Sequence, residues 1–496
     1  MNRRTFSQTL AGGVAARRAF GHSAPSGNAR PKNVLLLMAD QHRPTALGIN
    51  GDRVARTPNL DSLANTGARF DHAYCSSPVC VPSRASLLTG LWAHNHGAYS
   101  NGHAWPFQHK TIAHHFARAG YMTALIGKMH FVDAQTHGFD YHLDFNDWLQ
   151  YLGPKASMFA EEIGLRANSG SGLPQIPDLW RESGDPWPGA IPSDGRLGLV
   201  ALGRISKLEE RDHFESFVTR ESIRFLKEQA REQPFLLIGS YLKPHDPFMP
   251  AARFYNMFRA GDMKIPDTWH KVNLATVPAE IRESIQNERF EPELLHDPEN
   301  VKRQIALYYA NLAQMDDNIG QMLGAIRDLK LENDTVVVYT SDHGEMLGEH
   351  GLWQKMVFYE PAAGVPLIFR VPGITEPGSR TPTLVSLVSV LPTLLELCGI
   401  PAPSGLDGES LAGDLHNSHR TRDTTVYSEY ALASKGAKAM IRHGDYKYIN
   451  YSHDAPDEMF NLRDDPREMN NLAIQPAFSA RADELKSKLF AWHRPA

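Results

Sequence analysis

Four short aliphatic runs limit what this chain can fold into. They are residues 34–39 (VLLLMA), 121–127 (YMTALIG), 234–241 (PFLLIGSY) and 335–340 (TVVVYT). None of them alternates strictly between apolar and polar residues, and such runs are typical of strands covered on both faces, as in a mostly parallel sheet. Helical patterns lie between the runs, so the sequence predicts an α/β fold with a large central, mostly parallel sheet flanked by helices.

The pattern of apolar and turn-forming residues changes after about residue 400. Short runs such as TTVYSEY, AKAMIRHG and YKYINY follow, separated by turn-forming residues, and RADELKSKLFAWH then has a helical pattern. They predict a smaller antiparallel sheet with a terminal helix. We therefore expect a main domain over residues 32–405 and a C-terminal subdomain over 406–496. Residues 151–212 are rich in Pro and Gly, which predicts long loops over one face.

Composition excludes several classes of protein. The chain has 496 residues, a net charge of −5 and three cysteines. The negative charge argues against a general nucleic-acid binder. No apolar stretch approaches the roughly 20 residues of a membrane span, and three cysteines cannot form a disulfide framework.

The N-terminus, residues 1–24, has features of a targeting segment. The pair Arg3–Arg4 precedes a mildly apolar stretch that ends in small residues. This resembles a twin-arginine export signal and predicts a periplasmic or secreted protein. The pair Arg17–Arg18 interrupts the apolar part, so a basic tail on a cytoplasmic protein is the alternative.

Each aliphatic run leads into polar residues that are able to bind a ligand. In chain order these are Asp40, then Lys128 and His130, then His245, and finally Asp342 and His343. An aspartate after a strand is often only a helix cap, and a lone histidine is more often packed or solvated than catalytic. Because ligands of open α/β sheets bind outside the carboxyl ends of the strands, four such ends predict one shared crevice.

The polar residues in this crevice suit a metal ion. Asp40 and Asp342 offer the oxygen ligands that a hard divalent cation prefers, and Gln41 can add an amide oxygen. His343 can add a nitrogen, which shifts the preference toward manganese or another transition ion.

The stretch CVPSRASLLTG places Cys80 at the mouth of a predicted helix over residues 83–89. Pro82 fits the first turn of a helix, and helix N-termini favour anions. Arg84 adds a fixed charge with a fork of donors that matches a tetrahedral anion, and such a setting is expected to lower the pKa of a thiol. Cys80 is therefore predicted to mark a nucleophile, with a small buried residue as the alternative, which we prefer for the other two cysteines.

These motifs resemble a known family. CVPSRASLLTG is similar to the C-x-P-S-R signature of the type I, formylglycine-dependent sulfatases, which belong to the alkaline-phosphatase-like superfamily. NVLLLMADQ, GKMH, KPHDPF and SDHGEMLGEHGLWQK resemble that family's metal and substrate segments, in the same order. The pairs Asp40–Gln41 and Asp342–His343, where many members have Asp-Asp and Asp-Asn, resemble the choline sulfatase and phosphonate monoester hydrolase branch.

The resemblance implies that Cys80 is a precursor. A separate formylglycine-generating enzyme would oxidise it to formylglycine (3-oxoalanine), whose hydrate attacks sulfur and later expels sulfate. One divalent cation is implied, Ca²⁺ first, with Mn²⁺ or Mg²⁺ suggested by the amide and imidazole ligands. The implied metal ligands are Asp40, Gln41, Cys80, Asp342 and His343.

The resemblance also implies roles for other residues. Arg84 would orient the hydrate, Lys128 and Lys355 would bind sulfate oxygens, His130 would act as a base and His245 as the general acid. We also expect Asn101 and His94 to face the substrate, and His96 is a further candidate for such a contact. The loops over residues 94–110 and 150–215 are expected to shape the pocket.

Three functions follow as hypotheses. The first is hydrolysis of a sulfate ester to an alcohol and sulfate. The alternative at the same site is hydrolysis of a phosphonate monoester or a phosphodiester. The third, from another class, is a binding module without catalysis, which the complete motif set disfavours. The expected partner is a small-molecule or saccharide sulfate ester, and the sequence leaves sugar, choline-like and aryl alcohols open, together with the oligomeric state.

Overall fold

A computed structural model describes residues 33–102, 108–131, 135–162, 203–229, 232–286, 297–420, 422–432, 436–451 and 456–493. Residues Lys32–Ala496 form one compact unit, and the predicted boundary at residue 405 lies within it and stays a prediction. The predicted export signal and most of the predicted loops over 151–212 lie outside the described residues. Among the described helices, none is long and apolar enough to cross a membrane.

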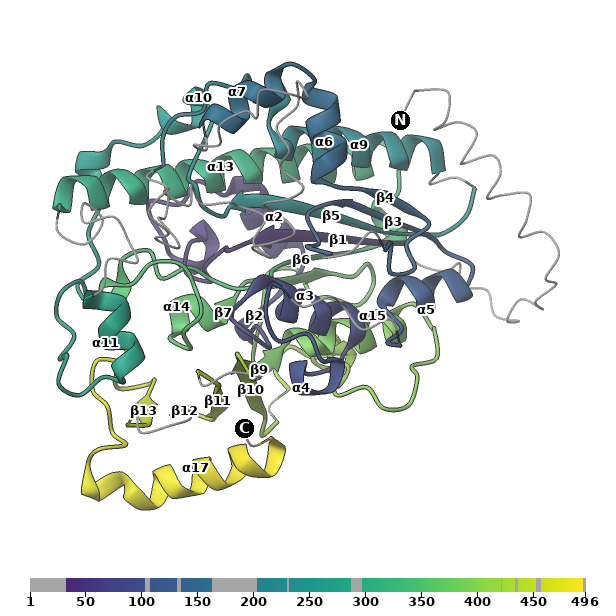
Figure 1. Ribbon diagram of the computed structural model, residues 1–496. Helices are drawn as coiled ribbons and strands as arrows, with labels where there is room; N and C mark the ends of the chain where they lie inside the picture. Colours follow the sequence, from purple (N-terminus) through teal and green to yellow (C-terminus); the bar gives the residue numbers. More distant parts are fainter. Residues whose placement is uncertain are drawn as a thin grey trace. The chain divides into compact units, whose positions relative to one another are not determined.

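A nine-stranded mixed sheet forms the centre of this unit (Figure 1). Its order is β4-β3-β5-β1-β6-β8-β2-β7, and β9 pairs with β2. The strands are β1 (Asn33–Asp40), β2 (Ala68–Tyr74), β3 (Met122–Gly127), β4 (Tyr141–Leu143), β5 (Phe235–Pro244), β6 (Thr335–Ser341), β7 (Gly364–Val365), β8 (Leu367–Arg370) and β9 (Ser379–Ser386). β4, β3, β5, β1 and β6 pair in parallel, whereas β8 and β7 run antiparallel to their partners. The four aliphatic runs are β1, β3, β5 and β6, so the predicted sheet is confirmed.

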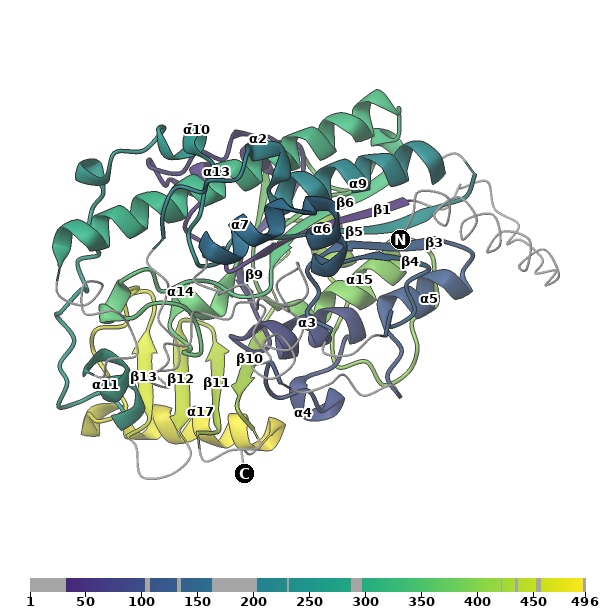
Figure 2. The same cartoon turned by 45° about the horizontal axis from the view of Figure 1, so that its top comes forward.

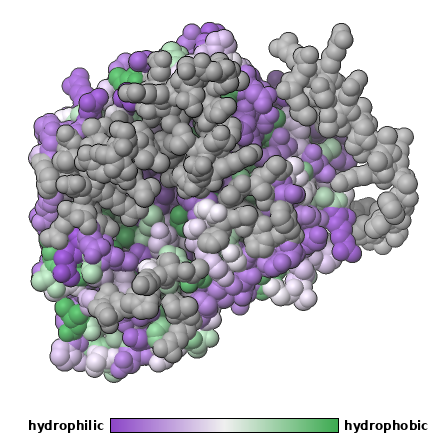
Figure 3. All heavy atoms as spheres, viewed as in Figure 1, coloured by the Kyte–Doolittle hydropathy of each residue, from purple (hydrophilic) through white to green (hydrophobic). Residues whose placement is uncertain are grey.

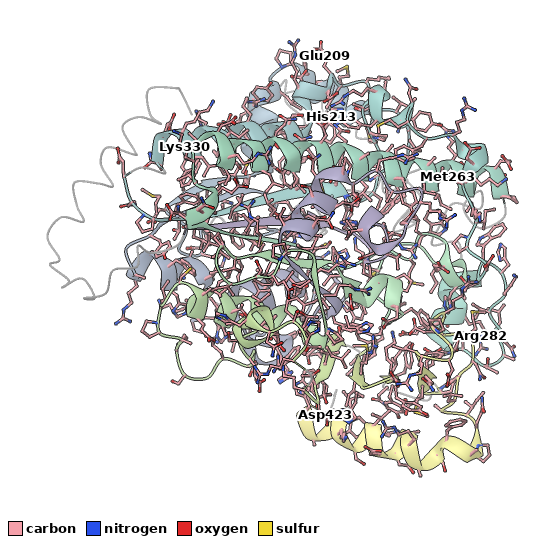
Figure 4. All side chains as sticks on the ribbon, turned by 180° about the vertical axis from the view of Figure 1, so that it is seen from behind. Glu209, His213, Met263, Arg282, Lys330 and Asp423 are labelled. Atoms are coloured by element: carbon pink, nitrogen blue, oxygen red, sulfur yellow. The ribbon has the colours of Figure 1, made fainter. Side chains whose placement is uncertain are left out.

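Helices cover both faces of this sheet. They are α2 (Pro58–Thr66), α3 (Cys80–Thr89), α4 (Ala93–His96), α5 (Ile112–Arg118), α6 (Phe145–Leu152), α7 (Lys155–Glu162), α9 (Phe214–Gln229), α10 (Ala252–Tyr255), α11 (Ala279–Gln286), α13 (Pro298–Asp328), α14 (Glu360–Ala363), α15 (Val390–Leu397), α16 (Ala412–His416) and α17 (Ser479–Trp492). Figure 1 shows α9 and α13 on one face and α3, α5 and α15 on the other. In Figure 4, which views the molecule from behind, Lys330 lies just beyond the end of α13.

Helices cover both faces of the sheet, which explains why residues 34–39 of β1 are all apolar. Successive strand residues point to opposite faces. Leu35 and Leu37 belong to the core shared with α9 and α13, whereas Leu36 and Met38 belong to the core shared with α3, α5 and α15. All eight residues of the strand are buried.

The predicted C-terminal sheet and helix are also confirmed. Strands β10 (Thr425–Tyr430), β11 (Lys438–His443), β12 (Tyr446–Tyr451) and β13 (Glu458–Asn461) pair antiparallel in sequence order. α17 lies across them in Figure 2. Leu485 and Leu489 of this helix belong to one buried cluster with Ile441 and Tyr448 of the sheet.

One prediction needs correction. α7 and the end of α6 fall within residues 151–212, which the composition assigned to loops. An aromatic cluster holds them: the ring centroid of Trp148 lies 4.8 Å from that of Phe159 and 5.6 Å from that of Phe214. Packing among these aromatic rings therefore helps to stabilise α6 and α7.

The described surface is mostly hydrophilic on the face seen in Figure 3. Among the described residues, five large hydrophobic side chains are exposed: Tyr151, Ile205, Met257, Met469 and Ile474. Scattered single apolar residues of this kind need no functional explanation.

Candidate active site

The carboxyl ends of four neighbouring parallel strands deliver polar residues to one place. Asp40 ends β1, Lys128 follows β3, His245 follows β5 and Asp342 follows β6. All four side chains are buried. The sheet thus brings together residues that lie up to 302 positions apart, as the register of Ala39 with Ser341 on neighbouring strands requires.

Gly127 allows the segment after β3 to pass close to β5. Its φ is 116°, and a Cβ atom there would lie 1.9 Å from the carbonyl oxygen of Ser240. The N–H of Lys128 donates to that carbonyl at 3.0 Å. A side chain at position 127 would therefore displace Lys128 from the site.

Arg84 joins the strand ends from α3. Its Nη2 donates to Asp40 Oδ2 at 2.9 Å, and its Nε donates to Asp342 Oδ2 at 2.7 Å. Nη1 donates to the Lys128 carbonyl at 2.6 Å and to Ser240 Oγ at 3.0 Å. The guanidinium is fully buried, so it holds the two carboxylates in fixed positions.

Helix α3 begins at Cys80, three residues earlier than predicted, and ends as expected at Gly90, whose φ is 70°. Two N–H groups of its first turn have acceptors. The N–H of Val81 donates to Asn101 Oδ1 at 3.0 Å, Pro82 has no N–H, and that of Ser83 donates to the Val79 carbonyl at 3.2 Å. The positive charge beside Cys80 therefore comes from side chains more than from the helix terminus.

The Cys80 thiol is fully buried, and its Sγ lies 3.3 Å from His343 Nε2 and 3.9 Å from Lys128 Nζ. Burial and the neighbouring Asp40 raise the pKa of this thiol to about 12. The expectation of a lowered pKa is wrong, because removal of the thiolate from water outweighs the attraction of the nearby lysines. The unmodified side chain is a protonated thiol, which is a weak nucleophile.

The donor atoms around Cys80 fit a divalent cation. Ligand atoms of Asp40, Cys80, Asp342 and His343 all lie within 4.8 Å of one another. Asp40 Oδ1 has no hydrogen-bond donor among the described residues, although it is buried. Burial pushes the pKa of Asp40 up, but Lys128, His245 and Arg84 hold it well below its ordinary value, so the carboxylate is charged. A buried, charged oxygen without a donor suits a cation.

His343 is prepared as a neutral ligand. Its Nδ1 lies 3.0 Å from the carbonyl oxygen of Gly344, which can only accept, so Nδ1 carries the proton. The Nε2 lone pair then faces Cys80 and Asp40. Burial lowers the pKa of His343 to about 4, which keeps the ring neutral near pH 7.

Lys355 and His245 form a second buried pair beside this cluster. Lys355 Nζ donates to Gln41 Oε1 at 2.6 Å and to His245 Nε2 at 2.7 Å. His245 Nδ1 donates to the Asp246 carbonyl at 2.5 Å. Burial and then Lys355 lower the pKa of His245, so the imidazole is neutral and its Nε2 accepts. His130, two residues after Lys128, is also buried.

The three residues expected to face a substrate have other partners. Asn101 caps the first turn of α3 through Val81. His94 Nδ1 lies 2.9 Å from the Glu429 carboxylate, and its ring stacks on His493 with centroids 4.2 Å apart. His96 Nε2 lies 3.0 Å from Ser86 Oγ. These contacts support α3 and join it to the C-terminal sheet, and a contact with substrate stays a prediction.

Sequence reasoning missed a set of polar residues around Gln41. They are Ser240, Asp246, Glu345 and Gln354, and all are buried or half-buried. Ser240 accepts from Arg84, Asp246 accepts from Gln41 and Gln354, and Glu345 accepts from the N–H of Gln354. Three of them lie inside the segments KPHDPF and SDHGEMLGEHGLWQK, and this was the only signal available.

Addition of a divalent cation is expected to raise the melting temperature (Tm) of protein that has been freed of metal with a chelator. An ion that binds only the folded chain stabilises it by about 2.7 kcal/mol at 100 times its Kd. Tm measured against added Ca²⁺, Mn²⁺ and Mg²⁺ checks this, and Asp342→Asn serves as the control in which the shift should shrink. An unchanged Tm with all three ions would contradict a cation at this cluster.

Two family models match the chain. The Sulfatase model covers residues 32–400, and the model described as N-sulphoglucosamine sulphohydrolase, C-terminal covers residues 348–494. Among curated proteins, a choline-sulfatase of Rhizobium meliloti is 31% identical over 90% of this chain and 83% of its own. An arylsulfatase of Clostridium perfringens is 28% identical over 92% of this chain and 93% of its own.

Solved structures share the fold. The phosphonate monoester hydrolase of Agrobacterium radiobacter matches with a TM-score of 0.77 at 24% identity, covering 93% of this chain and 95% of its own. The two proteins therefore share their overall fold. With the Sulfatase model matching most of its length and a named choline-sulfatase at 31% identity, the chain belongs to the sulfatase family.

Proposed function

We propose that the protein hydrolyses sulfate esters to an alcohol and inorganic sulfate, with Cys80 oxidised to formylglycine and one divalent cation bound. The observation that carries this proposal is the cluster of Asp40, Cys80, Asp342 and His343 at the strand ends. Named sulfatases among the relatives support the reaction class. When bound, the cation supplies Lewis-acid polarisation and the oxidised residue supplies the attacking hydroxyl.

The lysines are assigned to the sulfate group. Arg84 already uses its donors on Asp40, Asp342, Ser240 and the backbone. Lys128 Nζ pairs with Asp40 Oδ2 at 2.5 Å and lies 3.9 Å from Cys80 Sγ, and Lys355 Nζ lies 2.7 Å from His245 Nε2. An ammonium has three donors, so both groups can bind sulfate oxygens and stabilise charge that develops on them.

His245 is assigned to the leaving alcohol. Its Nδ1 is held by the Asp246 carbonyl, which leaves Nε2 as the atom that can pass a proton to the alcohol oxygen. Nε2 now accepts from Lys355 at 2.7 Å, so we assign the proton to uptake from solvent, with Lys355 turning to the sulfate oxygens and Nε2–H to the alcohol. His130 is proposed as the base that acts on the hydrate at residue 80.

Replacement of His245 should matter most for substrates with poor leaving groups. His245→Gln is expected to reduce kcat/KM for an alkyl sulfate by about 10²–10⁴-fold, because an alkoxide needs a proton to leave. For 4-nitrophenyl sulfate the loss should be much smaller, since nitrophenolate leaves without one. Rates on the two esters check this, and equal losses on both would count against a general acid.

Cleavage of a phosphonate monoester or phosphodiester at the same site is the second candidate. It is favoured by the Gln41 and His343 pair and by a 26% identical relative named a multifunctional alkaline phosphatase superfamily protein, from Trinickia caryophylli. Comparison of kcat/KM on nitrophenyl sulfate and on a phenylphosphonate nitrophenyl ester separates the two. We expect a preference for the sulfate, and a large preference for the phosphonate would replace the first proposal by the second.

Maturation, metal and location complete the proposal. We propose Ca²⁺ as the ion, a formylglycine-generating enzyme as the maturation partner, and export through the twin-arginine-type segment at residues 1–24. Metal analysis of purified protein, with Mn²⁺ and Mg²⁺ as the other outcomes, tests the first point. Cell fractionation of the Arg3→Lys, Arg4→Lys double variant tests the proposed export, because the protein should stay in the cytoplasm when the arginine pair is lost.

The alcohol is proposed to come from a small molecule or a saccharide. A solved relative, at a TM-score of 0.71, is described in complex with its substrate D-glucosamine-2-N,6-O-disulfate, and another curated relative is an N-acetylglucosamine-6-O-sulfatase of Bacteroides thetaiotaomicron. A panel of sulfated sugars, choline sulfate and aryl sulfates identifies the preferred class.

A further inference from the structure

The side-chain amide of Gln41 has a hydrogen-bond donor beside its oxygen and hydrogen-bond acceptors beside its nitrogen. On one side, Lys355 Nζ donates to Oε1 at 2.6 Å. On the other, Nε2 donates to Asp246 Oδ1 at 3.0 Å and also to Glu345 Oε2. An ammonium can only donate and an ionised carboxylate can only accept, so Lys355 and Asp246 select the same orientation of the amide. Burial raises the pKa of Glu345 to about 7, and in its charged form this carboxylate selects that orientation too.

The two carboxylates are themselves held in place. Asp246 Oδ2 accepts from Gln354 Nε2 at 3.1 Å. Glu345 Oε1 accepts from the backbone N–H groups of Leu347 and Gln354, both at 2.7 Å. Glu345 is fully buried and Asp246 nearly so, at 0% and 5% exposure. Neither carboxylate can therefore turn away from Gln41 without losing a buried hydrogen bond.

Glu345 also connects Gln41 to the segment that carries Lys355. The N–H of Gln354 that donates to Glu345 belongs to the residue just before Lys355, and the N–H of Met346 donates to the Gln354 carbonyl at 2.8 Å. One carboxylate therefore fixes both the nitrogen end of the Gln41 amide and the backbone beside the lysine that meets its oxygen end.

We propose that Asp246 and Glu345 are positioning residues that fix the amide of Gln41 with its oxygen, the atom of the amide that can bind a cation, turned toward Lys355 and away from the two carboxylates. This inference rests on the proposed function for the presence of the cation. Neither residue is assigned to touch substrate. Their effect is transmitted through Gln41, and the amide in the opposite orientation would present N–H groups to an ammonium and a carbonyl to two carboxylates.

The same arrangement gives a physical reason for glutamine at position 41. A carboxylate there would face Asp246 and Glu345 at hydrogen-bonding distance, and three carboxylates without a donor between them repel one another. An amide supplies the missing donor and still offers an oxygen on its other side. The residue at 41 and the pair at 246 and 345 are thus complementary in hydrogen-bonding character.

Exchange of donors and acceptors tests this complementarity. In Asp246→Asn/Glu345→Gln, the oxygens that accept from Gln354 and from the backbone keep their donors, so both new amide groups turn N–H toward Gln41. We expect the Kd of Ca²⁺, and of Mn²⁺ as second probe, to weaken by about 10–100-fold, the usual loss on removing such support. Adding Gln41→Glu to this double variant should restore most of the affinity, because a carboxylate then faces two donors.

The measurement is a calorimetric titration of the metal ion into full-length protein that has been freed of metal with a chelator and whose Cys80 is unmodified. It therefore does not depend on turnover. Glu458→Gln is the matched control: it changes a buried carboxylate that accepts from Tyr359 and Tyr451 in the C-terminal subdomain. Its Kd should stay within about twofold of wild type, the size of ordinary non-additivity. Melting temperatures of all metal-free variants separate loss of folding from loss of binding.

Two results would overturn the inference. One is an Asp246→Asn/Glu345→Gln double variant that binds as tightly as wild type. The other is a triple variant with Gln41→Glu that binds no better than the double variant, since a merely structural loss would not be rescued by a third substitution. A wild-type chain that binds neither ion would overturn this inference and the cation of the proposed function together, whereas turnover of phosphonates alone would leave the inference standing.

Discussion

Cys80→Ala is expected to abolish hydrolysis of sulfate esters, with a fall in kcat on the order of 10⁴-fold or more, as for removal of other catalytic nucleophiles. The side chain lies among the candidate metal ligands, 3.3 Å from His343 Nε2, and alanine offers no group there that could be oxidised or attack sulfur. Folding should change little, because the residue is small and lies in the first turn of α3.

Cys75→Ala is the matched control for this variant. Cys75 is also fully buried and lies five residues upstream, but it contributes no atom to the candidate metal cluster. The control should keep activity near that of wild type. Mass spectrometry of the Cys80 peptide, from a host that carries the maturation enzyme, should show conversion to the aldehyde. Full activity of Cys80→Ala, or of protein whose Cys80 is unmodified, would exclude the proposed chemistry.

Arg84→Met is expected to cost stability as well as activity. The guanidinium bridges Asp40 and Asp342 at 2.9 and 2.7 Å, and all three side chains are completely buried. Removing one partner of a buried ion pair typically costs about 3–5 kcal/mol, because it leaves a charge uncompensated. Burial pushes the pKa of Asp40 up, but Lys128, His245 and Arg84 outweigh burial and hold it well below its ordinary value. The loss should therefore persist at neutral and mildly acidic pH and should shrink only as pH falls through that lowered pKa.

Chemical denaturation with and without Ca²⁺ checks this prediction. An added cation should offset part of the loss, since it would neutralise the same carboxylates. Arg84→Lys should not restore the wild-type stability, because one ammonium cannot donate to both carboxylates in the fork geometry. Arg442→Met is the control: this buried arginine pairs with Glu360, which Lys447 also contacts at 2.7 Å, so activity should persist. A stability of Arg84→Met equal to wild type would contradict the bridging role.

Much of the fold could be predicted from local pattern. The four aliphatic runs predicted β1, β3, β5 and β6, because a strand buried on both faces must be apolar along its whole length. Gly90 marked the end of α3, since its φ of 70° suits a residue without a side chain. The helices within 151–212 were missed, because contacts of Trp148 with distant aromatic rings stabilise them.

Much of the candidate site could be predicted as well, but only as residue types. Asp40, Lys128, His245 and Asp342 follow strands, and their positions in the chain predicted one crevice. The partners of Gln41 could not be predicted in this way. Asp246 and Glu345 lie 205 and 304 positions away, and only the pairing of β1 with β5 and β6 brings them to the amide.

The sequence by itself determined the α/β class, the order of the elements and the chemical groups that reach the strand ends. Only the tertiary structure decided how those groups act on one another. Burial raises the pKa of Cys80 instead of lowering it, Asn101 accepts from the first turn of α3, and the Gln41 amide donates to two carboxylates. The physical reason is that periodicity and residue type are local properties, whereas desolvation and hydrogen bonding depend on neighbours that the strand order alone brings together.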